Sequence, residues 1–201
     1  MADAQTRGRG RERREWASPK GGLWFSVVFK PRKIKDPFFY GKLMAVSTAQ
    51  TLRRIGADVN LKWPNDFFFN GKKLGGMLVE GVFEGAMPLV IVVGIGLNVN
   101  NELPDHLKGF AISLKDILKK EIPPKELLRL ILKRARSNRR KYSCCPHILT
   151  RIWKEMLDLK EGQNVECCGR SWKIERILPD RIILERDGER REIKSARELY
   201  G

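Results

Sequence analysis

The chain has 201 residues and a net charge of +16, and 42% of its residues are hydrophobic. This length accommodates one domain of ordinary size with a small appendage, and the hydrophobic content excludes a generally disordered chain. No apolar run reaches the roughly 18 residues of a membrane span, so we expect no membrane association. The charged N-terminus has no apolar segment of the signal-peptide kind behind it, which predicts a cytoplasmic protein. The basic excess indicates nucleic acid, an anionic surface, an acidic partner or an anionic substrate.

The first half of the chain alternates strand and helix patterns. Residues 1–21 are polar and rich in Arg and Gly, which predicts a loop. Asp36-Pro37 is typical of a helix start, Gly56 suits its end, and Asn70-Gly71 is a strong hairpin turn. The expected elements are strands over Leu23–Phe29, Val59–Trp63, Asp66–Phe69, Lys72–Val82 and Leu89–Val99, with the helix between the first two.

The second half begins with helices. Ser113 starts a short helix, Pro123-Pro124 opens a longer one with one apolar face, and Ile148–Leu157 is a third amphipathic segment. The other face of the long helix carries Arg134, Arg136, Arg139, Arg140 and Lys141. We interpret this charge run as a solvated helix face, which is the usual reason for such a pattern.

From Leu159 onward the pattern predicts strands only. They are expected over Asn164–Cys168, Trp172–Ile177, Arg181–Glu185 and Arg190–Lys194, with turn residues between them, which is typical of a small barrel. The predicted fold class is therefore α+β: a mixed β-sheet with packed helices, followed by a small SH3-like β-barrel. We expect a larger domain over 1–158 and a C-terminal barrel domain over 159–201.

The four cysteines and two histidines do not indicate a metal site. The cysteines form adjacent pairs at 144–145 and 167–168, and neither spacing is that of a zinc or redox motif. Adjacent cysteines rarely bridge each other, because the geometry strains the peptide between them. We interpret the cysteines as reduced and structural, and we assign no residue as a metal ligand.

Three segments carry candidate chemistry. Residues 7–14 contain five arginines interleaved with glycines, and Arg binds carboxylates and phosphates through paired hydrogen bonds. The alternative is a disordered basic arm on nucleic acid, but the segment leads directly into a strand, which favours an ordered binding loop. Lys62 stands at the end of a strand, before Trp63-Pro64. Gly94 and Gly96 leave one face of a strand bare, so that a flat ligand or another backbone can pack against it; the alternative is a simple strand kink.

Together these motifs resemble those of biotin protein ligases. The likeness extends over essentially the whole chain. It rests on Gln5–Arg11, Trp16–Pro19, Gly21–Leu23, Lys62–Asp66, Gly71–Gly76, Val79-Glu80 and Gly94–Asn100, in this order.

The resemblance implies an ATP-dependent, AMP-forming enzyme. Such ligases join biotin to AMP and then pass the biotinyl group to one lysine of a carrier domain of a biotin-dependent carboxylase. The first step brings two anions together, so cations and Mg²⁺ must neutralise them. By resemblance, Lys62 and Arg11 are catalytic. Biotin is bound by Gln5, Arg9, Gly10, Arg11, Lys62, Gly94 and Gly96, and ATP or the adenylate by Arg14, Trp16, Lys73 and Asn98.

The resemblance also implies partners and one departure. The biotin carboxyl carrier domain is generally acidic in this family, and the exposed sheet face of such ligases is compatible with a homodimer. Members of the family normally have an additional strand, a helix and a Ser-Ser-Thr-Asn-like motif before this point. We therefore expect an N-terminally truncated catalytic core, with a late start assignment favoured over a real truncation. We expect no sequence-specific DNA binding, because there is no room for a DNA-binding domain.

Two other functions fit parts of the pattern. One is a basic nucleic-acid-binding module on the same fold. The other is lipoate or octanoate transfer on the related fold, although those relatives lack the Gly-Arg-Gly-Arg loop in this form.

Overall fold

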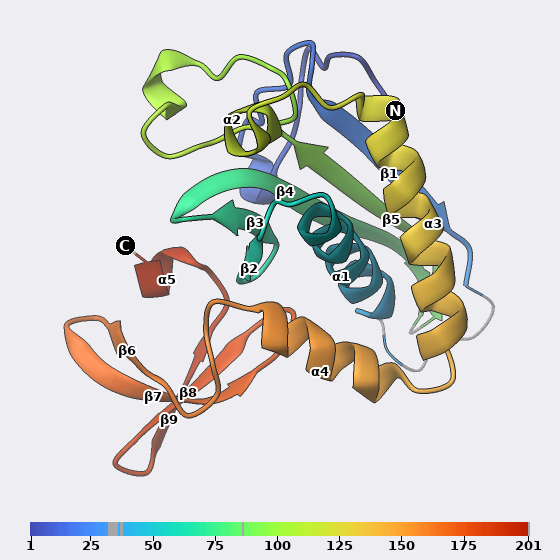
Figure 1. Cartoon of the computed structure of the whole chain (residues 1–201). Coiled ribbons are helices and arrows are strands. Elements are labelled where there is room, and N and C mark those ends of the chain that lie inside the picture. The colour runs from blue at the N-terminus through green and yellow to red at the C-terminus, as the bar shows by residue number, and fades with distance from the viewer. Residues whose placement is uncertain (32–35, 37, 86, 201) are drawn as a thin grey trace.

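The computed structural model describes residues 1–31, 36, 38–85 and 87–200. It contains a five-stranded sheet with helices against it and a smaller four-stranded sheet at the C-terminal end (Figure 1). The strands are β1 (Leu23–Phe29), β2 (Asn60–Lys62), β3 (Asp66–Phe69), β4 (Lys72–Glu84), β5 (Met87–Leu97), β6 (Asn164–Cys167), β7 (Arg170–Ile177), β8 (Ile182–Arg186) and β9 (Glu189–Ile193). The helices are α1 (Phe39–Arg54), α2 (Leu114–Leu118), α3 (Pro124–Tyr142), α4 (Pro146–Met156) and α5 (Arg197–Tyr200), with 3-10 turns at Arg11–Arg13 and Asp105–Leu107.

The large sheet has the order β1-β5-β4-β3-β2, and all of these ladders are antiparallel. Strand β5 lies between β1 and β4, and its burial alternates from Ile91 to Leu97, because successive strand residues point to opposite faces. Its buried residues Ile91, Val93, Ile95 and Leu97 belong to the core that α1 also enters. Its other face carries Gly94 and Gly96, so at these two positions the strand itself contributes no side chain to that face.

Helix α1 is the main cover of the sheet, and nearly all of its residues are buried. It begins at Phe39 and not at the predicted Asp36-Pro37, although the Asp36 carboxylate accepts a hydrogen bond of 2.9 Å from the Phe38 amide. Pro37 lies outside the described residues. Helix α3 packs on α1, and the buried Asn138 donates to Ser47 and Gln50 of α1.

The hairpins follow the predicted turn chemistry. Asn70 and Gly71 both have positive φ, at 45° and 77°, as a tight two-residue hairpin requires. The next two strands are displaced from their predicted bounds: β4 continues to Glu84, and β5 ends at Leu97. A register shift at Val82/Phe83 lengthens this hairpin, and such a bulge leaves no clear signal in a single sequence.

The C-terminal sheet has the order β6-β7-β8-β9, and its four strands confirm the four strands predicted after Leu159. Helix α5 was not predicted, because four residues are too few to show a helical period. The two sheets are linked by hydrogen bonds: the Trp63 indole N–H donates to the Leu178 carbonyl at 2.9 Å, and the Asp158 amide to Leu61 at 2.9 Å. The domain boundary between residues 158 and 159 stays a prediction.

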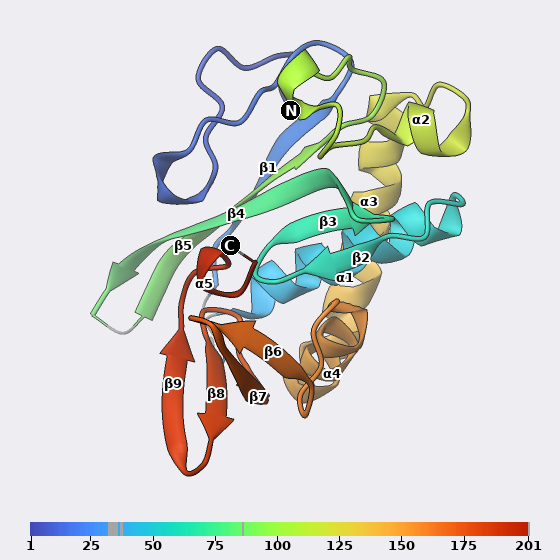
Figure 2. The same ribbon diagram turned by 90° about the vertical axis from the view of Figure 1, so that its left-hand side faces the viewer.

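The α+β fold class is confirmed, with helices against one sheet and a second small sheet after them (Figure 2). Parallel pairing among the described residues is limited to isolated bridges, Leu61 with Leu157 and Lys73 with Ala111. In the part of the chain that the structure describes, no helix combines the length and the apolar character needed to cross a bilayer.

Candidate active site

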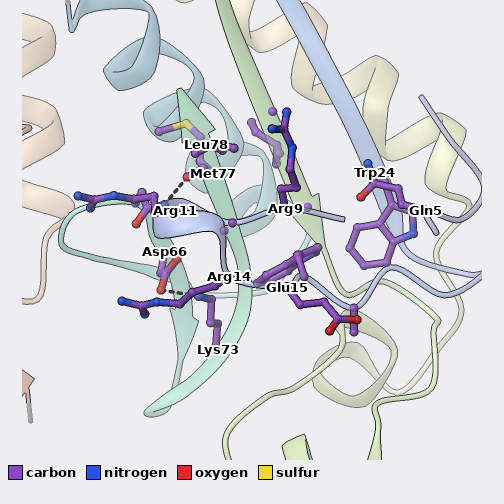
Figure 3. Close-up of a pocket in the computed structure, with 18 of the residues that line it drawn as sticks. Gln5, Arg9, Arg11, Arg14, Glu15, Trp24, Asp66, Lys73, Met77 and Leu78 are labelled. Atoms are coloured by element: carbon purple, nitrogen blue, oxygen red, sulfur yellow. Dashed lines mark hydrogen bonds and ion pairs between the residues drawn. The ribbon is translucent and has the colours of Figure 1, made fainter. Parts of the chain in front are cut away.

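A cavity of about 450 Å³ lies between the N-terminal loop and the face of β4 and β5 that carries the glycines (Figure 3). The structure brings almost all the predicted site residues together in its lining. They are Gln5, Arg9, Gly10, Arg11, Arg14, Trp16, Lys73, Gly94, Gly96 and Asn98, and only Lys62 of the predicted set is not among them.

The N-terminal loop is folded back on itself and tied to β1. The Trp16 amide donates to Gly8 at 2.9 Å, and the Gly10 amide donates to Arg14 at 2.7 Å, so that the arginine-rich turn is closed. Gly8 is required here, because a Cβ would lie 2.2 Å from the Trp16 carbonyl oxygen. Gln5 is held from the other side, where its side-chain oxygen accepts from the Ser18 hydroxyl at 2.7 Å. These contacts favour the ordered binding loop over the disordered arm.

Trp16 crosses the floor of the cavity at Gly96. A Cβ on Gly96 would lie 2.6 Å from Trp16 Nε1, so only glycine leaves room for this indole. The ring packs edge-on against Trp24, with centroids 6.4 Å apart. The Trp16 Nε1 atom is buried and has no hydrogen-bond partner among the described residues. Buried donors are normally satisfied, and this indole N–H instead faces the backbone at Gly96.

Lys73 and Asn98 line the same cavity from the sheet. Lys73 Nζ lies 2.6 Å from Asp66 Oδ2 and 5.1 Å from the centroid of the Trp16 ring. Figure 3 shows this ion pair beside Arg14. The buried amide of Asn98 accepts from Asn101 Nδ2 at 3.2 Å, so its orientation is set by neighbours.

The acidic residues in the lining are largely matched by cations. Arg9 lies 3.8 Å from Glu80, and Arg14 forms an ion pair with Glu12. The hydrogen bond from Arg14 holds the pKa of the Glu12 carboxyl below its usual value. Arg11 makes no ion pair with any residue that the structure describes, and these exposed pairs are individually weak. A ligand with several negative groups can therefore compete for the guanidinium groups.

Lys62 is placed one strand outside the cavity. It lies on the edge strand β2, directly opposite Asp66 of β3. Its Nζ lies over the Phe68 ring, 5.0 Å from the centroid. Directly opposed residues in an antiparallel pair share a face, and Asp66 lines the cavity. Lys62 is therefore on the cavity side of the sheet, with its side chain directed along the strand toward Phe68.

Two parts of the lining were not predicted. One is the loop from Leu103 to Ala111, which is tied to β4 because the Lys73 amide donates to Phe110 at 2.8 Å. Phe110 is 76% exposed although it borders the cavity. The other is Ser195-Ala196, which follows β9. Neither has a motif of its own, and their position depends on how distant segments pack.

The sequence and the fold both match known proteins. Residues 1–98 match the model of the biotin/lipoate A/B protein ligase family. The bifunctional ligase/repressor BirA of Bacillus subtilis is 37% identical over 138 residues, which is 66% of this chain and 42% of that protein. Biotin–protein ligase 2 of Arabidopsis thaliana is 35% identical over 136 residues, 64% of this chain and 39% of that protein. The chain thus spans about two fifths of the length of these two relatives.

A solved structure covers nearly the whole chain. The biotin protein ligase of Aquifex aeolicus, in complex with biotin and ATP, matches with a TM-score of 0.77 and 30% identity over 96% of this chain and 84% of that one. The fold, the order of the motifs and these matches agree: the chain belongs to the biotin/lipoate A/B protein ligase family.

Proposed function

We propose that this protein is a biotin–protein ligase. It activates biotin with ATP to form biotinyl-5′-AMP, and it then transfers the biotinyl group to a lysine of the carrier domain of a biotin-dependent carboxylase. The observation that carries the proposal is the cavity itself, in which the arginine loop faces β5 at Gly94, next to the Trp16 indole that lies over Gly96. The match to a ligase solved with biotin and ATP supports it.

The first step joins two anions. An oxygen of the biotin carboxylate attacks the α-phosphorus of ATP, the bond to the β-phosphate breaks, and pyrophosphate leaves. Arg9 and Arg11 neutralise the carboxylate and the α-phosphate, and Arg14 contacts the phosphates. Preorganised cations of this kind stabilise charge that develops in the transition state. In this proposal Lys62 swings from Phe68 toward Asp66 and supplies a further positive charge.

The remaining lining residues hold the ligand in place. Gly94 lets the biotin rings lie against β5, Gly96 makes room for the Trp16 indole that borders them, and Gln5 bonds their polar edge. The Trp16 ring contacts the adenine. Lys73 and Asn98 contact the nucleotide. In the second step the amine of the carrier lysine attacks the acyl carbon and AMP departs, with loss of one proton from nitrogen.

The site fits a Mg²⁺ ion that arrives with ATP. The described residues contain no cluster of three or more His, Cys, Asp or Glu side chains suited to a metal. Mg²⁺ typically uses one or two carboxylates together with substrate phosphates. Asp66 is the lining carboxylate that would hold the ion, in exchange for its ion pair with Lys73. The ion would neutralise charge on the phosphates.

The test is a reaction of the protein with biotin, Mg-ATP and a carrier domain, followed by mass spectrometry for biotinyl-AMP and for the carrier gaining one biotinyl group. A longer form of the protein that includes additional upstream sequence is run beside it. If both forms are inactive, the proposal fails. Product with lipoate or octanoate and none with biotin would assign the chain to the lipoate side of the family.

Lys62→Ala separates this function from a merely basic surface. The variant should lose adenylate formation at least about 100-fold, the scale of losing one preorganised donor, while its thermal unfolding is unchanged. Lys72→Ala is the control, because Lys72 is likewise a lysine at one end of a strand of the same sheet, although it is exposed whereas Lys62 is half-buried. If the Lys62→Ala variant forms the adenylate as fast as the Lys72→Ala control, Lys62 has no role in the mechanism.

Location and assembly belong to the same proposal. We place the protein in the cytoplasm, which is supported by the four free thiols among the described residues, since reducing compartments keep cysteines unpaired.

We also propose a homodimer, supported by the exposed apolar side chains Val28, Val82 and Phe83 on β1 and β4, because such patches mark contact surfaces. Light scattering at several concentrations tests it, and a monomer throughout contradicts it.

A further inference from the structure

Helix α3 carries a straight row of cations that the proposed reaction does not use. Five exposed residues, Lys125, Arg129, Lys133, Arg136 and Arg140, are spaced four, four, three and four positions apart. Residues at such spacing lie on one side of a helix, and here that side is opposite the buried positions Leu127, Ile131 and Ala135. We call this row the basic stripe.

The basic stripe destabilises the helix that carries it. Lys125–Arg129, Arg129–Lys133 and Arg136–Arg140 are like-charge pairs at i,i+4, and such pairs oppose helix formation. Glu126 is the only acidic residue of α3, and no residue of the stripe forms an ion pair within the described parts of the chain. By contrast, α4 pairs its Arg151 with Glu155. A local conflict of this kind is typical of a functional surface.

The stripe is remote from the cavity. Helix α3 lies along the outer edge of the molecule beside α1 (Figure 1), and α1 covers the face of the sheet whose buried residues include Val93 and Ile95. The cavity is on the opposite face, at Gly94 and Gly96. A carrier domain whose lysine must enter the cavity does not reach the stripe in the same encounter.

We propose that the basic stripe binds the phosphate backbone of duplex DNA without reading its sequence. From Lys125 to Arg140 the helix rises about 22 Å, roughly the length of six to seven base pairs at about 3.4 Å each. Cations in a row suffice for binding by counterion release, and phosphate contacts carry no sequence information. The surface thus differs from a sequence-specific DNA site.

Two other anionic partners fit the surface less well. A folded acidic protein normally needs a buried aromatic or similar anchor at the centre of its interface, and the stripe contains only Lys and Arg. An anionic membrane holds an amphipathic helix through an apolar face, whereas the apolar face of α3 is buried against α1. Leu130, the exposed apolar residue of α3, lies to one side of the stripe.

The test measures fluorescence anisotropy of a labelled random-sequence 20-base-pair duplex at several salt concentrations. Five phosphate contacts predict a slope of about −4.5 in log affinity against log salt, hence about a 500-fold loss between 50 and 200 mM salt. The triple variant R129Q/K133Q/R136Q should bind at least about tenfold more weakly at 50 mM salt, and its slope should be about −2, since each lost phosphate contact removes about one unit.

The matched control is R170Q/K173Q/R176Q, which removes the same charge from the exposed residues of β7. It should keep the slope and bind within about threefold of the unmodified protein. Equal weakening by both triple variants would mean that net charge alone binds DNA, and the proposal would fail. Tighter binding of poly-glutamate or of phosphatidylserine vesicles than of the duplex would also overturn it.

Two further measurements on the stripe variant, its thermal unfolding and its rate of carrier biotinylation, separate weaker DNA binding from misfolding and from a loss of ligase activity. The stripe variant should unfold at the same or a higher temperature, because the like-charge pairs are gone. Its rate of carrier biotinylation should be unchanged, since α3 contributes nothing to the cavity lining. A protein inactive as a ligase can still show the stripe-dependent salt slope, so the two proposals fail separately.

Discussion

The Trp16 indole lies directly over the bare backbone of Gly96, at a distance that excludes any side chain at that position. A Cβ on Gly96 would be 2.6 Å from Trp16 Nε1 and 3.0 Å from Trp16 Cε2. Trp16 belongs to the N-terminal loop and Gly96 to strand β5. Their contact joins the arginine loop to the sheet and forms the cavity floor.

Gly96→Ala should displace this indole. Forcing a methyl group into a packed contact typically costs about 1–3 kcal/mol, and here it would also move the loop that carries Arg9 and Arg11. We expect a lower melting temperature and at least a tenfold weaker affinity for biotinyl-AMP, measured by calorimetric unfolding and titration. An unchanged affinity would mean that the Trp16 position does not matter for binding.

Gly94→Ala, two residues away on the same strand, should leave the stability of the fold unchanged, unlike Gly96→Ala. A Cβ there meets Ser26 Oγ at 3.6 Å and the Leu78 carbonyl oxygen at 3.7 Å, which are ordinary contacts. The melting temperature should stay within about 2 °C, as for substitutions without a steric conflict. Affinity for free biotin should still fall, because the methyl group occupies the cavity floor. Unchanged biotin affinity would place biotin elsewhere.

Asn138→Ala should destabilise the contact between α3 and α1. Asn138 is 5% exposed and donates to Ser47 at 3.0 Å and to Gln50 at 2.9 Å. Removing a buried partner leaves the others unsatisfied, at a cost of about 1–3 kcal/mol. Urea unfolding measures this free energy. Ser137→Ala, at an exposed position of the same helix, should change it by less than about 0.5 kcal/mol.

Glu161 should make the stability depend on pH. Burial would raise the pKa of its carboxyl, but hydrogen bonds from Lys154 and from the Ile177 amide outweigh burial and lower the pKa below the usual 4.5. The carboxylate therefore stabilises the fold above that usual value, and this contribution is lost as the pH falls through the lowered pKa.

Glu161→Gln should consequently lower the melting temperature by about 1–3 °C at pH 7, a small effect because the side chain is partly exposed. The difference from the unmodified protein should shrink as the pH falls below 4.5 and through the lowered pKa of the Glu161 carboxyl, because the native carboxyl is then protonated. Glu155→Gln is the control at an exposed ion pair of α4. A difference that persists in acid would indicate a packing effect and not a charge effect.

Local patterns in the chain predicted most of the elements. Strand β1 has its predicted bounds, because a short apolar run between two polar segments clearly marks where a buried strand begins and ends. Asn70-Gly71 forms the expected turn, because few other residues adopt positive φ at both positions. Helix α1 begins later than predicted. The β4–β5 hairpin extends further than predicted, because the register shift in its ladder depends on the partner strand.

The sequence by itself determined the residue types of the site and their order along the chain: the arginine-glycine loop, the lysine at the strand end and the paired glycines of β5. Only the tertiary structure decided where they meet. The loop reaches the sheet because Trp16 fits over Gly96, while the edge position of β2 and the Phe68 ring place Lys62 outside the cavity. The physical reason is that side-chain identity is local, whereas contact depends on the register and packing of segments far apart in the chain.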